Sequence, residues 1–217
     1  MTLANTRELV TAAVAAGGAI SAFNVITLEH AEAIAEGAAR AQTPVLLQLS
    51  ENAVRYHGAL EPLLVACREV ARAAPVPVAI HLDHVEDAAL IDRTLEVAAE
   101  FGVGSIMVDA SKLDYEANAA ATAAVASRAH ALGLWVEAEL GAIGGKDGAH
   151  APGVRTVLAE ARAFVAATGI DGLAVAVGSS HAMRDRSASL DFELIAEVTG
   201  QPVRAIRHLH QAEELPG

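Results

Sequence analysis

The sequence reads Val78-Ala79-Ile80-His81-Leu82-Asp83-His84 where an apolar run, typical of a buried strand, gives way to imidazole and carboxylate side chains. The same change recurs at other places along the chain. Apolar runs also end at polar residues, which are Asn24, Ser50, Asp109, Glu139 and, after a short turn, His181. A series of polar strand ends, each followed by a helical pattern, indicates a catalytic face built from the carboxyl ends of parallel strands.

Strand and helix patterns alternate along the chain. We predict strands over residues 22–25, 45–49, 78–82, 105–108, 134–140 and 173–177, with a weak seventh beginning at Pro202-Val203. Helical patterns lie between the strands, over residues 6–16, 29–41, 61–74, 87–101, 115–132, 158–168 and 192–198. Short strands that alternate with helices predict βα units and a parallel sheet.

Two α/β architectures fit this alternation. A doubly wound sheet gathers its ligand site at one switch point, whereas a closed barrel uses the ends of many strands. Because polar groups mark successive strand ends, we expect a TIM (β/α)8-type barrel, formed as a single domain over residues 1–217. Eight βα units typically need about 250 residues. We therefore expect an incomplete barrel, with the last one or two βα units missing or altered.

Composition narrows the class of protein. The chain has 217 residues, 53% of them hydrophobic and only 3% aromatic, which suits helices packed on a parallel sheet of small residues. The net charge of −12 argues against a nucleic-acid partner. There is no signal-peptide pattern at the start and no apolar run long enough for a bilayer, so we expect a cytoplasmic protein without a membrane partner. The single cysteine, Cys67, reads as a buried thiol.

Two histidines from different strand ends could share a metal ion with nearby acids. His84 follows Asp83 directly, and His181 follows a short turn that begins at Gly178. Imidazoles joined by carboxylates suit a divalent transition metal, zinc most readily. The backbone at Gly178 could approach and hold a phosphate.

Other candidates are open to a structural interpretation. Asp109 and Glu139 could belong to the site or could be helix caps and solvated loop acids. Glu137 lies two residues before Glu139, so both side chains point to the same face of the predicted strand, and a buried acid at Glu137 requires a partner. The glycine-rich loop over residues 141–153, which contains Asp147, could be a lid or a flexible surface connection.

Taken together, these residues resemble the class II, metal-dependent ketose-bisphosphate aldolases, which include the fructose- and tagatose-bisphosphate enzymes. The resemblance extends from about Thr6 to Glu197. The matching stretches are Ala22-Phe23-Asn24, Ile80 to His84, Ser105 to Ser111, Val136 to Gly141 and Gly169 to His181. It implies a TIM barrel, usually a homo-oligomer, that reversibly cleaves a ketose 1,6-bisphosphate into dihydroxyacetone phosphate and glyceraldehyde 3-phosphate.

The resemblance also implies roles for individual residues. By matching position, His84 and His181 are two ligands of a catalytic zinc ion, and Asp83 exchanges a proton with the substrate C4 hydroxyl. The zinc would stabilise the negative charge left when the C3–C4 bond breaks. A second position, for a divalent or monovalent cation, would use Asp109 and Glu139. The remaining assignments are Asn24, Ser50, Gly178 and Ala182 to substrate contacts, and Asp147 to the acid of the mobile loop.

The chain departs from the family pattern after about Gln201. The third zinc histidine of the family lies in a Leu-His-Gly stretch, but this chain reads Pro202-Val203-Arg204-Ala205-Ile206-Arg207-His208, and only a register shift would let His208 or His210 substitute. We therefore expect a C-terminally truncated or frame-shifted aldolase. Two alternatives remain open: a non-catalytic barrel that acts as a subunit partner or scaffold, and a metal-independent barrel isomerase.

Overall fold

The computed structural model describes residues 3–140, 155–177 and 191–199. Within them, six parallel strands form one sheet in the sequential order β1 to β6. The strands are β1 (Ser21–Asn24), β2 (Val45–Ser50), β3 (Val78–Val85), β4 (Val103–Val108), β5 (Trp135–Glu139) and β6 (Gly172–Ala174). A doubly wound sheet would reverse its strand order at a switch point, so the sequential order excludes that architecture. The α/β prediction is confirmed as a half-barrel of parallel strands.

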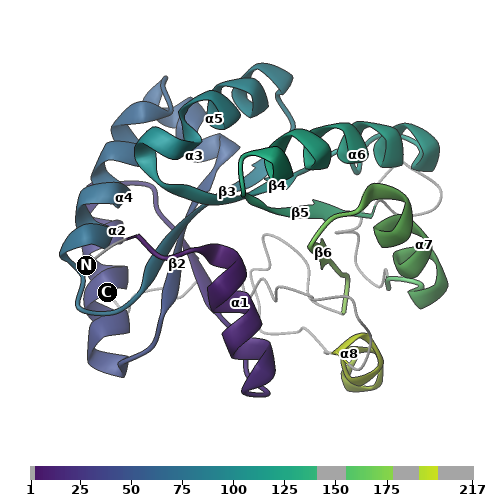
Figure 1. Ribbon diagram of the computed structural model, residues 1–217, viewed down its shortest axis with the longest axis horizontal. Coiled ribbons are helices and arrows are strands. Elements are labelled where there is room, and N and C mark those ends of the chain that lie inside the picture. The colour runs from purple at the N-terminus through teal and green to yellow at the C-terminus, as the bar shows by residue number, and fades with distance from the viewer. Residues whose placement is uncertain (1–2, 141–154, 178–190, 200–217) are drawn as a thin grey trace, which may run out of the picture.

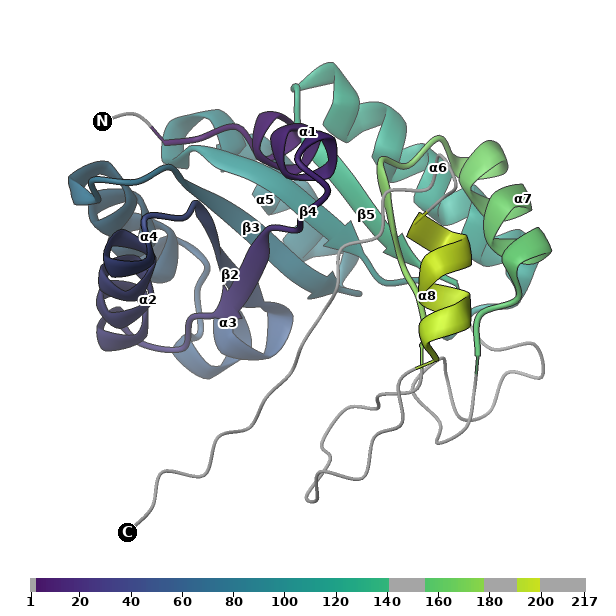
Figure 2. The same cartoon turned by 90° about the horizontal axis from the view of Figure 1, so that it is seen from below.

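Helices cover the outer side of the curved sheet (Figures 1 and 2). The helices are α1 (Thr6–Ala15), α2 (Leu28–Ala41), α3 (Glu51–His57), α4 (Glu61–Ala73), α5 (Ala88–Phe101), α6 (Tyr115–Ala131), α7 (Leu158–Thr168) and α8 (Phe192–Thr199). Local sequence sets several of their ends. Asp87 and Asp114 cap the amino ends of α5 and α6, and Gly102 ends α5 in the left-handed conformation.

The half of the half-barrel interior toward the amino ends of the strands is apolar. Leu46 and Ala79 are register partners on β2 and β3, and they lie in one buried cluster with Trp135 of β5. Gly172 of β6 leaves room for that indole, because a Cβ at this position would lie 2.2 Å from Trp135 Cη2. Helix α1 closes this end of the half-barrel, since its Val10 is buried in the same cluster.

The half of the interior toward the carboxyl ends of the strands is polar, because the inward-facing residues there are polar rather than apolar. Gln48 of β2 pairs in register with His81 of β3, and Ser50 with Asp83. Glu137 and Glu139 occupy alternate positions on β5, and both are buried. Because successive side chains of a strand point to opposite faces, alternate polar residues of β2, β3 and β5 lie on the inner face near the carboxyl edge of the sheet, where the candidate site lies.

Most predicted elements are present, although several bounds differ; β3 continues to Val85, three residues beyond its predicted end, and β4 begins at Val103, two residues before its predicted start. Helix α3, over Glu51–His57, had no counterpart among the predicted helices. Strand β6 covers only Gly172–Ala174 and begins one residue earlier than the predicted strand. The predicted seventh strand at Pro202-Val203 lies outside the described residues.

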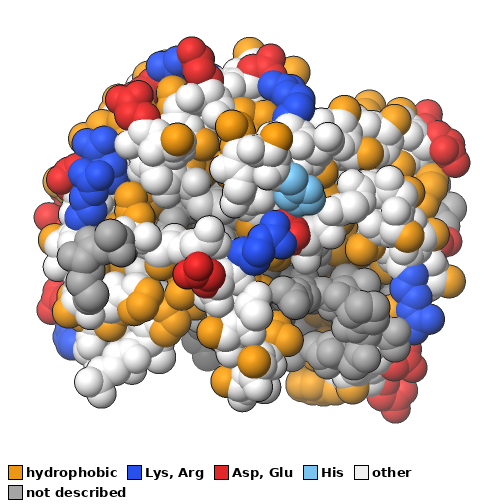
Figure 3. Space-filling view, viewed as in Figure 1, with side chains coloured by type: hydrophobic (Ala, Val, Ile, Leu, Met, Phe, Trp, Pro, Cys, Tyr) orange, Lys and Arg blue, Asp and Glu red, His pale blue; other side chains and the backbone are white. Residues whose placement is uncertain are grey.

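The outer helices carry mixed charge. Figure 3 shows acidic and basic side chains side by side on this face rather than one patch of a single sign. On the helices, Arg128 pairs with Asp92 and Arg93 with Glu61. Among the described residues, no helix is long and apolar enough to cross a membrane.

Candidate active site

Strand β3 contains an irregularity at Asp83 and His84. Leu82 pairs with Ile106 and Val85 with Val108, so β3 uses one more residue than β4 over this interval. His84 takes up the extra residue with a φ of 48°, in the left-handed region that non-glycine residues rarely adopt. Such a conformation costs about 1–3 kcal/mol. The bulge lets two consecutive side chains reach the same mouth of the half-barrel, whereas a regular strand would send them to opposite faces.

His84, Asp109 and Glu139 come together at the carboxyl ends of β3, β4 and β5. His84 Nδ1 lies 2.9 Å from Asp109 Oδ2 and 3.8 Å from Glu139 Oε2. The three side chains each offer a ligand atom, and these atoms all lie within 4.8 Å of one another. Ser111 fixes the other oxygen of Asp109, since its Oγ donates at 2.7 Å and its backbone N–H at 3.1 Å.

The surroundings of His84 and Asp109 move their pKa values in opposite directions. Burial disfavours the imidazolium, but the hydrogen bond to Asp109 and the nearby carboxylate charges raise the pKa of His84 to about 9. Those charges belong to Asp83, Glu139 and Asp109. Burial also disfavours the Asp109 carboxylate, but hydrogen bonds from His84 and Ser111 and the His84 charge lower the pKa of Asp109 to about 2. Without a metal ion, the pair is therefore an imidazolium and a carboxylate near neutral pH.

This pair predicts a pH dependence of folding for the chain stripped of metal by a chelator. The raised pKa of His84 gives stability that is fully present below its ordinary value of 6.5 and is lost as pH rises through about 9. The lowered pKa of Asp109 gives stability that is present above its ordinary value of 3.8 and is lost as pH falls through about 2. We expect the free energy of unfolding, measured with urea, to fall by about 1–3 kcal/mol between about pH 6 and pH 9.5.

The matched control for this pH dependence is His84→Gln, which cannot titrate and should show a markedly smaller change between the same two pH values. An equal change in the parent and in this variant would mean that other groups cause the loss.

Asp83 is buried, and within the described residues its carboxylate accepts a hydrogen bond from one side chain. Gln48 Nε2 donates to Asp83 Oδ2 at 2.8 Å and lies 3.2 Å from the Asn24 side-chain oxygen. The second oxygen of Asp83, Oδ1, has no hydrogen-bond partner among the described residues. One oxygen is thus fixed in place while the other remains able to accept a proton or a hydrogen bond.

A buried polar layer lies beneath Asp83. His81 Nε2 is 3.9 Å from Asp83 Oδ1 and 3.8 Å from Glu137 Oε2. On its other side, His81 Nδ1 lies 2.9 Å from Ser105 Oγ, which in turn lies 3.0 Å from Thr6 Oγ1. When the carboxylates are ionised they can only accept, so Nε2 carries the hydrogen and Ser105 donates to Nδ1. Glu137 is fully buried beside this imidazole, as its position on the strand predicted.

The structure places the other predicted site residues as follows. Asn24 is exposed at the end of β1. Ser50 caps α3, since its Oγ accepts from Ala53 N at 3.2 Å. Asp147, Gly178, His181 and Ala182 lie outside the described residues, as do His208 and His210.

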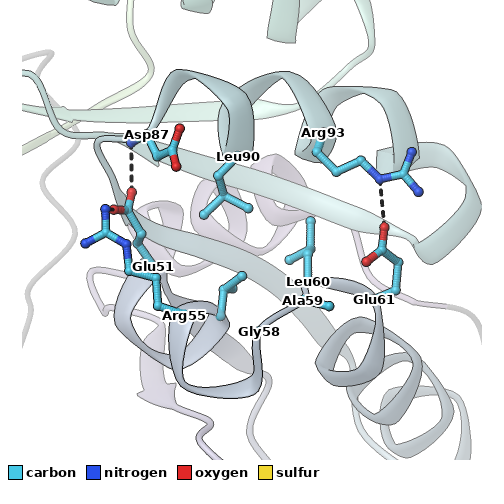
Figure 4. Close-up of a pocket in the computed structure, with 10 residues that line it drawn as sticks. Glu51, Arg55, Gly58, Ala59, Leu60, Glu61, Asp87, Leu90 and Arg93 are labelled. Atoms are coloured by element: carbon cyan, nitrogen blue, oxygen red, sulfur yellow. Dashed lines mark hydrogen bonds and ion pairs between the residues drawn. The ribbon is translucent and has the colours of Figure 1, made fainter.

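Two buried polar residues beside the site were missed at the level of sequence. Gln48 is a polar residue within the apolar run of β2, at a position whose side chain faces the interior. This interruption of the run is a signal that the sequence offers. Glu51 follows Ser50 and lies in α3, the helix that was not predicted. A groove of about 470 Å³ lies between α3, α4 and the start of α5, and Glu51 lines it (Figure 4). His84, Asp109 and Glu139 do not line this groove.

Comparisons with known proteins agree with this geometry. The chain matches the family model for class-II fructose-bisphosphate aldolase over residues 4–216. It is 41% identical over 179 residues to the fructose-bisphosphate aldolase of Thermus caldophilus, and the alignment covers 80% of this chain and 56% of the relative. This chain thus spans little more than half the length of that curated relative.

Solved structures give the same result. The YdjI aldolase from Escherichia coli K12 is similar with a TM-score of 0.78 at 31% identity, over 93% of this chain and 70% of that chain. A structure from Coccidioides immitis, provisionally named a fructose-1,6-biphosphate aldolase, also gives 0.78, at 35% identity over 92% and 71% of the two chains. The protein belongs to the class II fructose-bisphosphate aldolase family, which confirms the resemblance seen in the sequence.

Proposed function

We propose that this chain is a metal-dependent lyase that cleaves a ketose 1,6-bisphosphate, fructose or tagatose, into dihydroxyacetone phosphate and glyceraldehyde 3-phosphate. The observation that carries the proposal is the juxtaposition of a donor cluster, His84 with Asp109 and Glu139, and a buried carboxylate, Asp83, on the preceding residue of β3. Family membership supports the reaction type. A TIM barrel of eight βα units is the proposed context, of which six strands are described.

The donor cluster fits a divalent cation. Its side chains are little exposed, at 22% for His84, 9% for Asp109 and 1% for Glu139. Two carboxylates so close together in a buried site repel each other, and a cation relieves that repulsion. An imidazole with carboxylate oxygens is a donor set that zinc accepts. We propose Zn²⁺ at His84, with His181 as a further ligand. Asp109 and Glu139 would hold a second, divalent or monovalent cation at an alternative position in the same cluster.

The cation would act as a Lewis acid for the negative charge that develops on the dihydroxyacetone phosphate half. Asp83 would take the proton of the C4 hydroxyl during cleavage and return it during condensation. Gln48 fixes the carboxylate through Oδ2, and Oδ1 has no hydrogen-bond partner among the described residues. Asp109 holds the His84 ring through Nδ1 and so fixes which nitrogen carries hydrogen.

Substrate binding and assembly complete the proposal. Asn24 and Ser50 stand at the same edge of the sheet as Asp83, within reach of a sugar bound in the mouth. Gly178 and Ala182 would contact a phosphate, and Asp147 would supply a loop acid. We propose a homo-oligomer in the cytoplasm that acts on a phosphorylated sugar and not on nucleic acid.

An aldol-cleavage assay tests the function directly. The full chain, incubated with fructose or tagatose 1,6-bisphosphate, should release glyceraldehyde 3-phosphate when Zn²⁺ is supplied. A chelator should reduce the rate by at least about 100-fold, and added Zn²⁺ should restore it. Cleavage that persists in the chelator would overturn the metal-dependent mechanism. Tight Zn²⁺ binding without any cleavage would favour the non-catalytic barrel.

A further inference from the structure

Glu51 has a buried carboxylate whose contacts lie just beyond His84 in the chain. It opens α3 directly after β2, and its side chain is 6% exposed. Its Oε2 accepts from the backbone N–H of Glu86 at 2.7 Å and of Asp87 at 2.8 Å. The other oxygen pairs with Arg55, one turn further along α3. Figure 4 shows the carboxylate lying between Arg55 and the backbone at Asp87.

These contacts join three elements. Asp87 caps α5, because its side chain accepts from Ala89 N at 2.8 Å. Glu51 therefore ties the start of α3 to the connection between β3 and α5. A buried carboxylate is costly unless donors surround it, and here two N–H groups and a guanidinium do so. These donors offset the cost of burying the Glu51 carboxylate at this edge of the sheet.

His84 lies two residues before Glu86 and needs such support. Its left-handed backbone persists only where the flanking residues are fixed on both sides. On the side of β4, Asp109 N donates to Val85 O at 3.0 Å. On the side of β2, Glu51 holds the next two peptide groups. Release of either restraint would let the bulge relax and turn the imidazole away from its partners.

We infer that Glu51 is a positioning residue for His84: its carboxylate fixes the backbone after the bulge and so keeps the imidazole facing Asp109 and Glu139. This inference rests on the proposed function, because it gives His84 the role of a metal ligand. Glu51 itself does not belong to the donor cluster of His84, Asp109 and Glu139. Its effect on a metal ion would pass through the backbone.

Two substitutions separate positioning from simple charge. Glu51→Gln removes the charge, but its side-chain carbonyl can still accept both N–H groups. Glu51→Asp keeps the charge but is one methylene shorter, so its carboxylate withdraws from the two amides. If Glu51 positions His84, the aspartate variant is the impaired one. If Glu51 only attracts a cation by its charge, the glutamine variant is the impaired one.

The experiment measures Zn²⁺ affinity by competition with a chromophoric chelator, and amide hydrogen exchange of Glu86 and Asp87 in the zinc-free chain. For Glu51→Asp we expect Zn²⁺ affinity to fall by about 10–100-fold, the usual loss when a residue that orients a ligand is changed. Exchange of the two amides should accelerate at least about tenfold in the same variant. Glu51→Gln should stay close to the parent in both measurements.

The matched control is Glu61→Asp. Glu61 lines the same groove, but it pairs with Arg93 and not with the connection after β3 (Figure 4). It should leave Zn²⁺ affinity and both amides unchanged. Parent-like affinity in Glu51→Asp, or an equal loss in Glu51→Gln, would overturn the inference while the proposed function stands. Failure of the parent itself to bind Zn²⁺ would overturn the proposed function and the inference together.

Discussion

Replacing Asp83 with asparagine is expected to lower the turnover number for ketose bisphosphate cleavage by about 10²–10⁴-fold, the range typical for loss of an acid–base group. Asparagine is nearly isosteric, and its carbonyl can still accept from Gln48 Nε2, which lies 2.8 Å from Asp83 Oδ2. It cannot take the proton of the C4 hydroxyl. Because the hydrogen bond to Gln48 is kept, we expect the variant to fold, with a small loss of melting temperature from the lost attraction between Asp83 and His84. Steady-state kinetics and thermal unfolding check both parts.

The control for this substitution is Asp92→Asn. Asp92 lies on the outer face of α5, where its exposed carboxylate pairs with Arg128. This variant also removes one negative charge, but it should retain full activity because the pair is exposed and lies outside the donor cluster. Asp83→Asn should retain Zn²⁺ binding, which separates loss of the proton acceptor from loss of the metal site. An Asp83→Asn variant that cleaves as fast as the parent would refute the role given to Asp83.

Local sequence patterns were sufficient to predict the alternation of strands and helices. Strands β2 to β5 are short runs that are almost wholly buried, so hydrophobicity marks most of them, whereas β1 is largely exposed. The polar residues at the ends of these runs were also visible. Since parallel strands carry their carboxyl ends to one edge, Asp83, Asp109 and Glu139 could be expected to converge before any coordinates were known.

The backbone conformation at His84 could not be predicted in the same way. A left-handed backbone conformation is usually found at glycine, and the sequence His-Leu-Asp-His contains no glycine that would predict it. The bulge follows from the register of β3 against β4 and from restraints supplied by Asp109 and Glu51, which are distant in sequence. Residues that act through such tertiary contacts carry no local signal.

Helix α3 was missed for a different reason. It has only seven residues and follows β2 without an intervening loop, so it offers too few positions for a helical period to be recognised. Both of its ends nevertheless carry a sequence signal. Ser50 is a favourable residue for the amino-terminal cap, and Gly58, with a left-handed φ of 75°, is the carboxyl-terminal cap. Glu51 was overlooked because the helix that positions it was overlooked.

Removal of the His84 imidazole is expected to weaken Zn²⁺ binding by more than about 100-fold, since loss of a ligand exceeds the loss caused by a residue that only orients one. Two variants make the test sharp. His84→Ala keeps the left-handed backbone under strain, whereas His84→Gly adopts a φ of 48° without steric cost. We expect His84→Gly to be more stable than His84→Ala by about 1 kcal/mol, yet to bind Zn²⁺ equally poorly. Isothermal titration and urea unfolding measure the two quantities.

The stability difference matters because it rules out unfolding as the cause of weak binding. If disruption of the bulge were responsible, the glycine variant would recover part of the affinity along with the stability. His130→Ala is the matched histidine control. His130 bonds Asp171 at 2.9 Å beside the amino end of β6, at the opposite end of the half-barrel, and its removal should leave Zn²⁺ affinity unchanged. Full Zn²⁺ affinity in His84→Gly would exclude His84 as a ligand and, with it, the metal site at β3, β4 and β5.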